Sequence, residues 1–398
     1  MKNYEGYDDA QLRTRQTKNT FGDTHQHMMA FMFLCVVIAL IGFGLVCMYS
    51  ASYDEALRIG KNGSYFFLRQ FVFAILGLTV FTVLQFIPMR LIKLSIWMAL
   101  VVSFVLMLLT LITPLGVTRL GSRRWIEIPF LPSFQPSELL KLVTILALAY
   151  WFSSDRFKQY RLLYILVPVS VVLFGALLII AQKDYSTTLL YVGIALAMLI
   201  VVGILFRWIL LFIIAIGIPA IIFLLIEPYR IKRLTGFLFP DIDPTGINWQ
   251  VNNSLKAMAS GGLWGKGIGK GEYKLGSLPE VQNDFIFANI VEEMGIIGIL
   301  LVLTLFFLFA FIGFRTYRNL LPSRKFEAYA TFGLTCSIIW QALVNIAVVT
   351  GIFPPTGITL PFFSQGGTSL LVVIFESAMM YKMMQPAKEN VMKRSYDG

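Results

Sequence analysis

Long apolar stretches alternate with short polar connections along the whole chain. Each stretch has about 17 to 25 residues or more, the length that an α-helix needs to cross the hydrocarbon core of a bilayer. Ten such stretches occur, at approximately residues 29–51, 65–88, 92–114, 137–153, 162–181, 186–205, 207–227, 284–314, 326–350 and 367–384. The pattern therefore predicts an all-α integral membrane protein with about ten transmembrane helices.

The connections predict a polytopic membrane domain, residues 29–384, between two polar tails. Residues 1–28 and 385–398 are mixed in charge and poor in apolar periodicity, so we interpret both as flexible tails. Over the short loops, Lys and Arg are concentrated on the side of the tails. The positive-inside rule then places both termini in the cytoplasm. The first apolar stretch stays as an anchor, because a polar segment precedes it and no cleavage site follows.

Two outward connections are unusually long. Residues 115–136 combine arginines, a tryptophan and prolines, and residues 228–283 form an extracytoplasmic loop between the seventh and eighth helices. Connections usually have about 4 to 6 residues, and much longer ones are functional or disordered. Large apolar residues such as Phe237, Trp249 and Trp264 favour a loop that folds over the membrane mouth, with disorder as the alternative.

Composition supports the membrane assignment and excludes several functions. The chain is 57% hydrophobic and only 14% charged, against roughly 25% charged residues in soluble domains. The net charge of +11 is spread over many loops, which fits a membrane and argues against a nucleic-acid partner. The glycine-rich segment 260–276 follows no predicted strand, so we expect no nucleotide site. The two histidines, His25 and His27, lie in the N-terminal tail, which excludes a histidine triad or zinc site at the membrane.

Ionisable residues within or beside the apolar stretches are candidates for function, because burying a charge in a bilayer is costly. They are Arg69, Glu138, Lys141, Lys183, Asp184, Glu292, Glu293 and Glu376. Glu138 and Lys141 are spaced to pair along one helix, either to fix packing or to meet substrate. For Glu292 and Glu293, of which at least one must face the bundle interior, we favour a structural role.

Three carboxylates lie at outer helix ends. Asp184, in the turn "QKDYSTT", either caps the sixth helix or serves function. Asp284 opens the eighth span and Glu280 precedes it by four residues, so a helix cap beside a solvated acid is one interpretation. The other is a general base in a dry site at the membrane interface. Such a base could act only on a substrate whose reactive part lies just outside the bilayer, which points to a lipid-linked substrate.

Several separated motifs resemble one family in their order along the chain. They are "RRWI" from Arg123, "QPSELLKL" from Gln135, "SGGLWGKGIG" from Ser260, "LPEVQNDFIFANIVEEMG" from Leu278 and "PFFSQGGTSLL" from Pro361. The chain resembles the shape, elongation, division and sporulation family of peptidoglycan polymerases, from its first span to its last. The segments "KLGSLPE" and "TGITLPFFS" are more similar to its division branch than to its elongation branch.

The resemblance implies a glycosyltransferase of the bacterial cytoplasmic membrane that polymerises lipid II, with the family's catalytic aspartate at Asp284 and its neighbouring acid at Glu280. Arg123, Arg124, Lys141 and Lys183, or a divalent cation such as Mg²⁺ or Mn²⁺, would neutralise the diphosphate. No nucleotide or organic cofactor is implied. Further candidates for substrate binding are Asp184, Ser364, Gly366 and Gly367, in two motifs where this chain departs from the family pattern. The family's Gln-Pro-Asp turn appears here as "QKD", and its Ser-Tyr-Gly-Gly as "SQGG".

The resemblance also implies partners. A class B penicillin-binding protein would crosslink the glycan within the division or elongation machinery, because this chain contains no transpeptidase-like segment. Two other function classes remain open at this stage: a lipid II flippase or transporter, and a scaffold that only recruits partners. A flippase needs charged groups through the whole membrane thickness, whereas the polar motifs here concentrate in outward loops.

Overall fold

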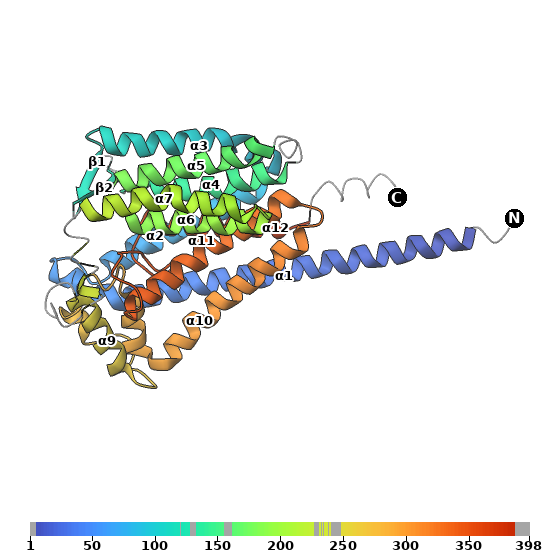
Figure 1. Cartoon of the computed structure of the whole chain (residues 1–398). Helices are drawn as coiled ribbons and strands as arrows, with labels where there is room; N and C mark the ends of the chain where they lie inside the picture. Colours follow the sequence, from blue (N-terminus) through green and yellow to red (C-terminus); the bar gives the residue numbers. More distant parts are fainter. Residues whose placement is uncertain are drawn as a thin grey trace.

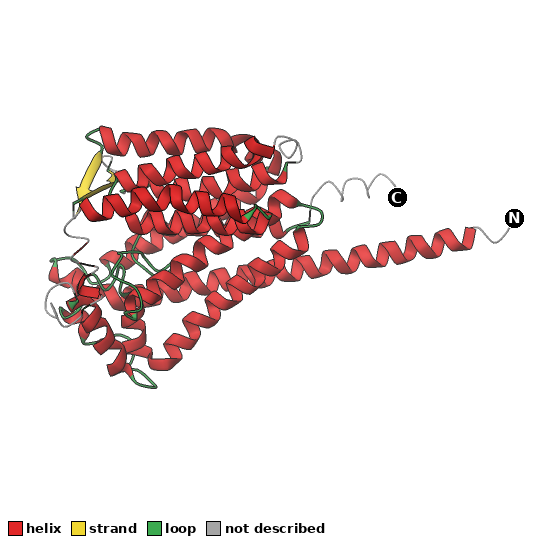
Figure 2. Ribbon diagram, in the orientation of Figure 1, coloured by secondary structure: helices red, strands yellow, loops and turns green. Residues whose placement is uncertain are grey.

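The computed structural model is a bundle of long helices (Figures 1 and 2). It describes residues 5–119, 121–127, 133–154, 161–226, 231, 233, 235–237, 239 and 248–386. Almost all of the predicted C-terminal tail and much of the first third of the predicted long loop lie outside the described residues.

Ten long helices coincide with the ten predicted spans. They are α1 (Glu5–Arg58), α2 (Tyr65–Phe86), α3 (Met89–Ile112), α4 (Pro136–Ser153), α5 (Arg161–Ala181), α6 (Tyr185–Val202), α7 (Phe206–Ile226), α10 (Ile286–Leu320), α11 (Lys325–Val349) and α12 (Gly367–Met384). Within the described residues, seven helices are long and apolar enough to cross a membrane: α1, α2, α3, α5, α6, α10 and α11. The all-α membrane class is therefore confirmed, and the count of ten crossings stays a prediction.

Helix α1 is longer than the sequence pattern indicates. Its apolar span begins at Gln26, but the helix already begins at Glu5, in the segment predicted as a flexible tail. Nucleation is the costly step of helix formation, and each further residue adds a hydrogen bond at little cost. The membrane span supplies the nucleus, and the polar residues before it extend the helix.

Helix α4 lies at the centre of the bundle. Nearly every residue from Leu140 to Phe152 is buried, and the helix packs against α3, α5, α6, α11 and α12. A helix that is apolar on all sides is typical of such a position. Helix α12 packs most closely against α2, so the last helix of the chain lies beside one from its first quarter.

The predicted loop 115–136 contains a small antiparallel hairpin of β1 (Gly116–Arg119) and β2 (Ser122–Ile126). Arg123 fastens this hairpin to the end of α3. Its guanidinium donates hydrogen bonds to the carbonyl oxygens of Gly116 (3.0 Å), Leu111 (3.1 Å) and Thr113. The strands are too short to show an apolar alternation, which is why the sequence predicted only a loop.

The described part of the long loop is folded, as expected, and contains α9 (Trp249–Gly261) and the short 3₁₀ helix η2 (Tyr273–Leu275). It docks where α10 is kinked at Gly295, whose backbone (φ 63°, ψ −147°) is not helical. Loop amides donate to α10 carbonyls there, from Lys266 to Glu292 (3.0 Å) and from Gly267 to Glu293 (2.9 Å). The kink therefore provides the attachment site for the loop.

The two adjacent glutamates reinforce this attachment. The carboxylate of Glu292 pairs with Lys266 (3.0 Å), and that of Glu293 pairs with Lys274 (2.9 Å). Ser50 of α1 also donates its hydroxyl to the Glu293 carboxylate at 2.6 Å. Both glutamates are buried and paired, in agreement with the structural role favoured from sequence.

Candidate active site

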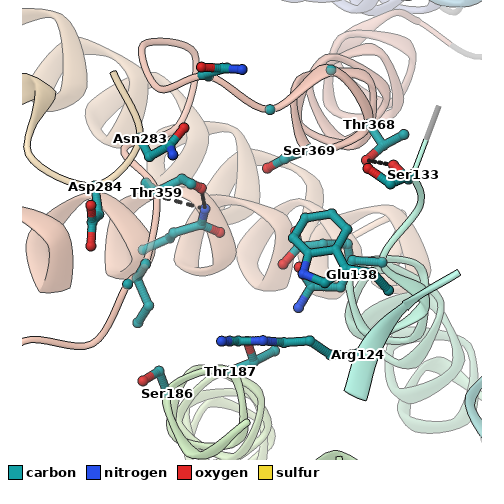
Figure 3. A pocket seen from close by; sticks show the side chains of 18 of the residues that line it. Arg124, Ser133, Glu138, Ser186, Thr187, Asn283, Asp284, Thr359, Thr368 and Ser369 are labelled. Carbon is teal, nitrogen blue, oxygen red and sulfur yellow. Dashed lines mark hydrogen bonds between the residues drawn. The ribbon is translucent and has the colours of Figure 1, made fainter. Parts of the chain in front are cut away.

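A cavity of about 580 Å³ lies at the end of the bundle where α2, α4, α6 and α12 begin. Its wall also includes the β2 residues Arg124 and Trp125, the segment before α10, and the segment between α11 and α12. Figure 3 shows that Asp284 and Asn283 lie on one side of this space and Arg124 on the other. The cavity thus places acidic and basic side chains from distant parts of the chain around one volume.

The acidic side consists of Glu280 and Asp284, both of which line the cavity. Asn283 links the two positions, because its backbone N–H donates to the Glu280 carbonyl (2.9 Å) and its side-chain amide donates to the Glu280 carboxylate. Glu280 has a left-handed backbone (φ 57°), which is uncommon for a residue other than glycine and which tightens this turn. Asn345 of α11 holds the turn in place by donating to the Asp284 carbonyl (2.8 Å).

Asp284 precedes α10, outside the spanning helix, and is enclosed by the cavity wall. Burial raises the pKa of its carboxyl to about 6, and the nearby Glu280 carboxylate contributes to the rise. Hydrogen bonding by its own backbone and the positive charge of Arg233 act in the opposite direction. A carboxylate with this pKa is ionised at neutral pH and is more basic than an ordinary aspartate, as a general base requires.

The basic side is built around Arg124 and Asp184. The Arg124 guanidinium lies 3.3 Å from the Asp184 carboxylate, which also accepts a hydrogen bond from Gln135 (3.0 Å). Asp184 caps α6 as well, since it accepts from the Thr187 backbone N–H (3.2 Å). Asp184 therefore caps α6, as one interpretation predicted, and it also pairs with a cation that lines the cavity. Its role in function stays a prediction.

A buried polar chain lies between these two sides. Lys141 pairs with Glu138 (3.0 Å), as their spacing predicted, and donates to the side chain of Gln341 (2.9 Å). Gln341 in turn donates to the Thr359 carbonyl (3.1 Å). Glu138, Gln341 and Thr359 line the cavity, whereas Lys141 lies behind them.

The structure separates the remaining candidates for substrate binding. Gly366 and Gly367 line the cavity. The cavity wall does not include Arg123, Lys183 or Ser364. The Arg123 guanidinium binds carbonyl oxygens of the hairpin and of the end of α3, and the Ser364 hydroxyl accepts a hydrogen bond from the Leu360 backbone N–H (2.8 Å). Lys183 occupies the turn before α6 with a left-handed backbone (φ 62°).

Sequence reasoning missed several lining residues. Arg69 had been noted as a charge in an apolar stretch but not assigned to a site, and it lies exposed on the cavity wall. Its neighbour Gln70 donates to the Ser364 carbonyl (3.1 Å), which joins α2 to the loop before α12. The rule that intramembrane charges mark function was the available signal for Arg69. For Thr356 and Thr359 the segment "TGITLPFFS" was the available signal, but it gave neither residue a role.

Unpartnered polar atoms also mark this space. Arg124 Nε, Thr356 Oγ1 and Gln365 Oε1 are buried and have no hydrogen-bond partner among the described residues, although all three residues line the cavity. Buried polar atoms are normally satisfied, and an exception calls for an explanation. A polar ligand in the cavity would supply the missing partners.

Comparisons with known proteins identify the family to which this chain is related. A cell cycle protein family that groups FtsW, RodA and SpoVE matches residues 30–389. The chain is 34% identical to a probable peptidoglycan glycosyltransferase FtsW of Borreliella burgdorferi, over 90% of this chain and 97% of the relative. It is 36% identical to stage V sporulation protein E of Bacillus subtilis, over 86% of this chain and 93% of the relative.

Solved structures share the fold. One was reported under the description "Structural coordination of polymerization and crosslinking by a peptidoglycan synthase complex". It superposes with a TM-score of 0.71 at 26% identity and covers 88% of this chain and 96% of that chain. The rod shape determining protein RodA of Thermus thermophilus superposes with a TM-score of 0.63 at 25% identity, over 88% of this chain and 95% of that chain.

Proposed function

We propose that this chain, which belongs to the FtsW/RodA/SpoVE family and is a peptidoglycan glycosyltransferase, polymerises lipid II. The match to this family confirms the resemblance inferred from the motifs. In this proposal Asp284 is the general base. In the proposed reaction, Asp284 takes the proton from the acceptor's 4-hydroxyl. That oxygen attacks the anomeric carbon of the donor sugar, and the lipid diphosphate leaves from the opposite face with inversion.

The observation that carries the proposal is the position of Asp284 in a cavity whose opposite wall is cationic. Its raised pKa of about 6 suits proton abstraction at neutral pH. Arg124 and the exposed Arg69 supply positive charge for the diphosphate, and the Asp184 carboxylate holds the Arg124 guanidinium in place. The unpartnered atoms of Thr356 and Gln365 are available to the sugars.

A divalent cation fits this donor set in one way only. Among the described residues, no group of three or more His, Cys, Asp or Glu side chains is placed to hold a metal ion. Mg²⁺, however, commonly takes one or two carboxylates and completes its shell with phosphate oxygens and water. Glu280, which lines the cavity, would hold it together with phosphate oxygens so that Asp284 stays available as the base, and its charge would neutralise the leaving diphosphate.

The proposal includes orientation and a partner. The start of the apolar part of α1 and the end of α12 lie at the same end of the bundle, because Asn319 contacts the sulfur of Met29 (3.7 Å) and Arg324 binds the Gln385 carbonyl (2.8 Å). With that end in the cytoplasm, the cavity opens at the outer face, because it lies at the opposite end of the bundle, where α12 begins.

The similarity to a synthase complex that couples polymerization and crosslinking supports a class B penicillin-binding protein as partner in the division or elongation machinery.

The test is glycan polymerisation from purified lipid II by the full chain, with the partner and Mg²⁺ or Mn²⁺ present. Asp284→Asn and Asp284→Ala are expected to lower the rate by roughly 10²–10⁴-fold, the usual contribution of a general base. Glu272→Gln is the matched control, because this exposed acid of the same loop lies outside the cavity and its side chain pairs with Lys266. Full activity of folded Asp284→Asn would refute the base assignment. Lipid II translocation without polymer from the native chain would favour a flippase.

A further inference from the structure

The turn at residues 262–270, which we call the Trp264 turn, exposes three large apolar side chains. Leu263, Trp264 and Ile268 are 65%, 78% and 59% exposed. None of them lines the cavity, so the proposed reaction does not explain them. A group of large exposed apolar side chains marks an interaction surface.

The turn is fixed beside the kink of α10. The Ile296 backbone N–H donates to the Leu263 carbonyl at 3.1 Å, immediately after the kink residue Gly295. From this point α10 presents exposed apolar side chains, Ile296, Ile297 and Leu300, along its spanning part. The apolar surface of the turn is therefore continuous with the surface that α10 presents to lipid.

Figure 1 places this region relative to the bundle. The kinked end of α10 and the adjoining loop lie to the side of the other helices and not beyond their outer ends. With the cavity end of the bundle on the outer side, as the proposed function requires, a turn in this position lies at the level of the outer membrane boundary. Water-exposed loops that extend away from the bundle have no comparable access to lipid.

The composition of the turn is that of a membrane interface, where tryptophan is enriched and lysine side chains meet phosphate groups. Lys266 is engaged with Glu292 and Glu272. Lys270 is exposed, and the described residues give it no carboxylate partner; its backbone N–H closes the turn on the Gly267 carbonyl (3.0 Å). Its ammonium group is thus available to an anionic headgroup beside Trp264.

We propose that the Trp264 turn is an interfacial anchor that binds the outer leaflet. Leu263, Trp264 and Ile268 enter the boundary between headgroups and acyl chains, and Lys270 contacts the phosphate of an anionic phospholipid. The turn is hydrogen-bonded to the Glu292 and Glu293 carbonyls, two turns after Asp284. The anchor therefore sets the height of Asp284 relative to the plane in which a lipid-linked diphosphate lies.

The test measures depth and does not depend on catalysis. The full chain, with Cys35, Cys47 and Cys336 replaced by Ala, carries one spin-labelled cysteine in nanodiscs of phosphatidylglycerol and phosphatidylethanolamine. The reference positions are Lys61→Cys, in the exposed turn between α1 and α2, and Leu300→Cys, on the lipid-facing side of α10. Accessibility to oxygen and to a water-soluble nickel chelate is measured for each label.

Labels at Trp264→Cys, and at Ile268→Cys with Trp264 intact, are expected to lie about 5–10 Å below the headgroup level, between the two references. Nickel accessibility equal to that at Lys61→Cys would overturn the proposal. Protection that appears only after the penicillin-binding protein is added would also overturn it and would assign the turn to a protein interface. Lys270→Glu should raise the nickel accessibility of the label at Ile268→Cys in anionic discs and should have little effect on it in phosphatidylcholine discs. In anionic discs, Lys270→Gln should have an intermediate effect.

Discussion

At the scale of single residues, the proposed base Asp284 predicts the pH range of activity. A general base works only when ionised, so activity should be lost as pH falls through the pKa of about 6 and should be constant above it. The measurement is kcat/KM against pH, which reports ionisation in the free enzyme. A profile that falls with rising pH across this range would contradict the assignment.

Glu280 provides a sharper form of this prediction. Its negative charge contributes to the raised pKa of Asp284, so Glu280→Gln should move the midpoint of the profile to lower pH. Glu272→Gln should leave the midpoint unchanged, since its side chain pairs with Lys266 outside the cavity. An unchanged midpoint in Glu280→Gln would show that another group controls the profile.

Residue types at helix ends made part of this site predictable. Asp284, Glu280 and Asp184 were candidates because a charged group at the boundary of an apolar span is costly without a function or a partner. Arg124 was a candidate only through the diphosphate that the family resemblance implies. Arg123 has the same residue type, yet it serves the hairpin. Which arginine of an adjacent pair faces a cavity depends on strand register, and a hairpin this short leaves no register signal in the sequence.

At the scale of elements, the kink of α10 is the feature on which the loop depends. Gly295 has φ 63° and ψ −147°, a backbone region that is essentially restricted to glycine. An added Cβ would lie 2.5 Å from the Gly265 nitrogen and from the Leu263 oxygen. Any side chain at this position must therefore displace the loop backbone.

Gly295→Ala is accordingly expected to destabilise the fold by about 1–3 kcal/mol through backbone strain alone. Displacement of the loop next to Asp284 should lower the polymerisation rate on the order of 100-fold. Thermal unfolding and the lipid II assay measure the two effects. Gly42→Ala in α1 is the control, because its Cβ would meet nothing within 4 Å. Native stability in Gly295→Ala would contradict the proposed role of the kink.

The helices themselves were predictable and the kink was not. Apolar length specified each of the ten helices to within a few residues, apart from both ends of α1 and the C-terminal end of α10. The segment around Gly295 is apolar on its C-terminal side and reads as one continuous helix. Its break is stabilised by amides of residues 266 and 267, and such contacts between distant segments leave no periodic pattern.

At the scale of the whole molecule, the arrangement of the helices predicts a topology. The turn at Lys61 lies at the cavity end of the bundle, and Ser323, between α10 and α11, lies at the other end. In intact spheroplasts of a cysteine-free background, an impermeant maleimide should label Lys61→Cys and should label Ser323→Cys only after permeabilisation. The reverse result would place the cavity on the cytoplasmic side and would exclude polymerisation at the outer face.

The junction between α2 and the loop before α12 also has a consequence for biosynthesis. Gln70 and its partner Ser364 are 294 positions apart, and Arg69 and Gly367 both line the cavity. Ribosomes add about 5–20 residues per second, so α2 waits in the bilayer for roughly 15–60 s before its neighbour is made. During that interval Gln70, which is buried in the finished fold, lacks its partner Ser364. The α2 face that packs against α12 therefore meets its partner only when synthesis of the chain is nearly complete.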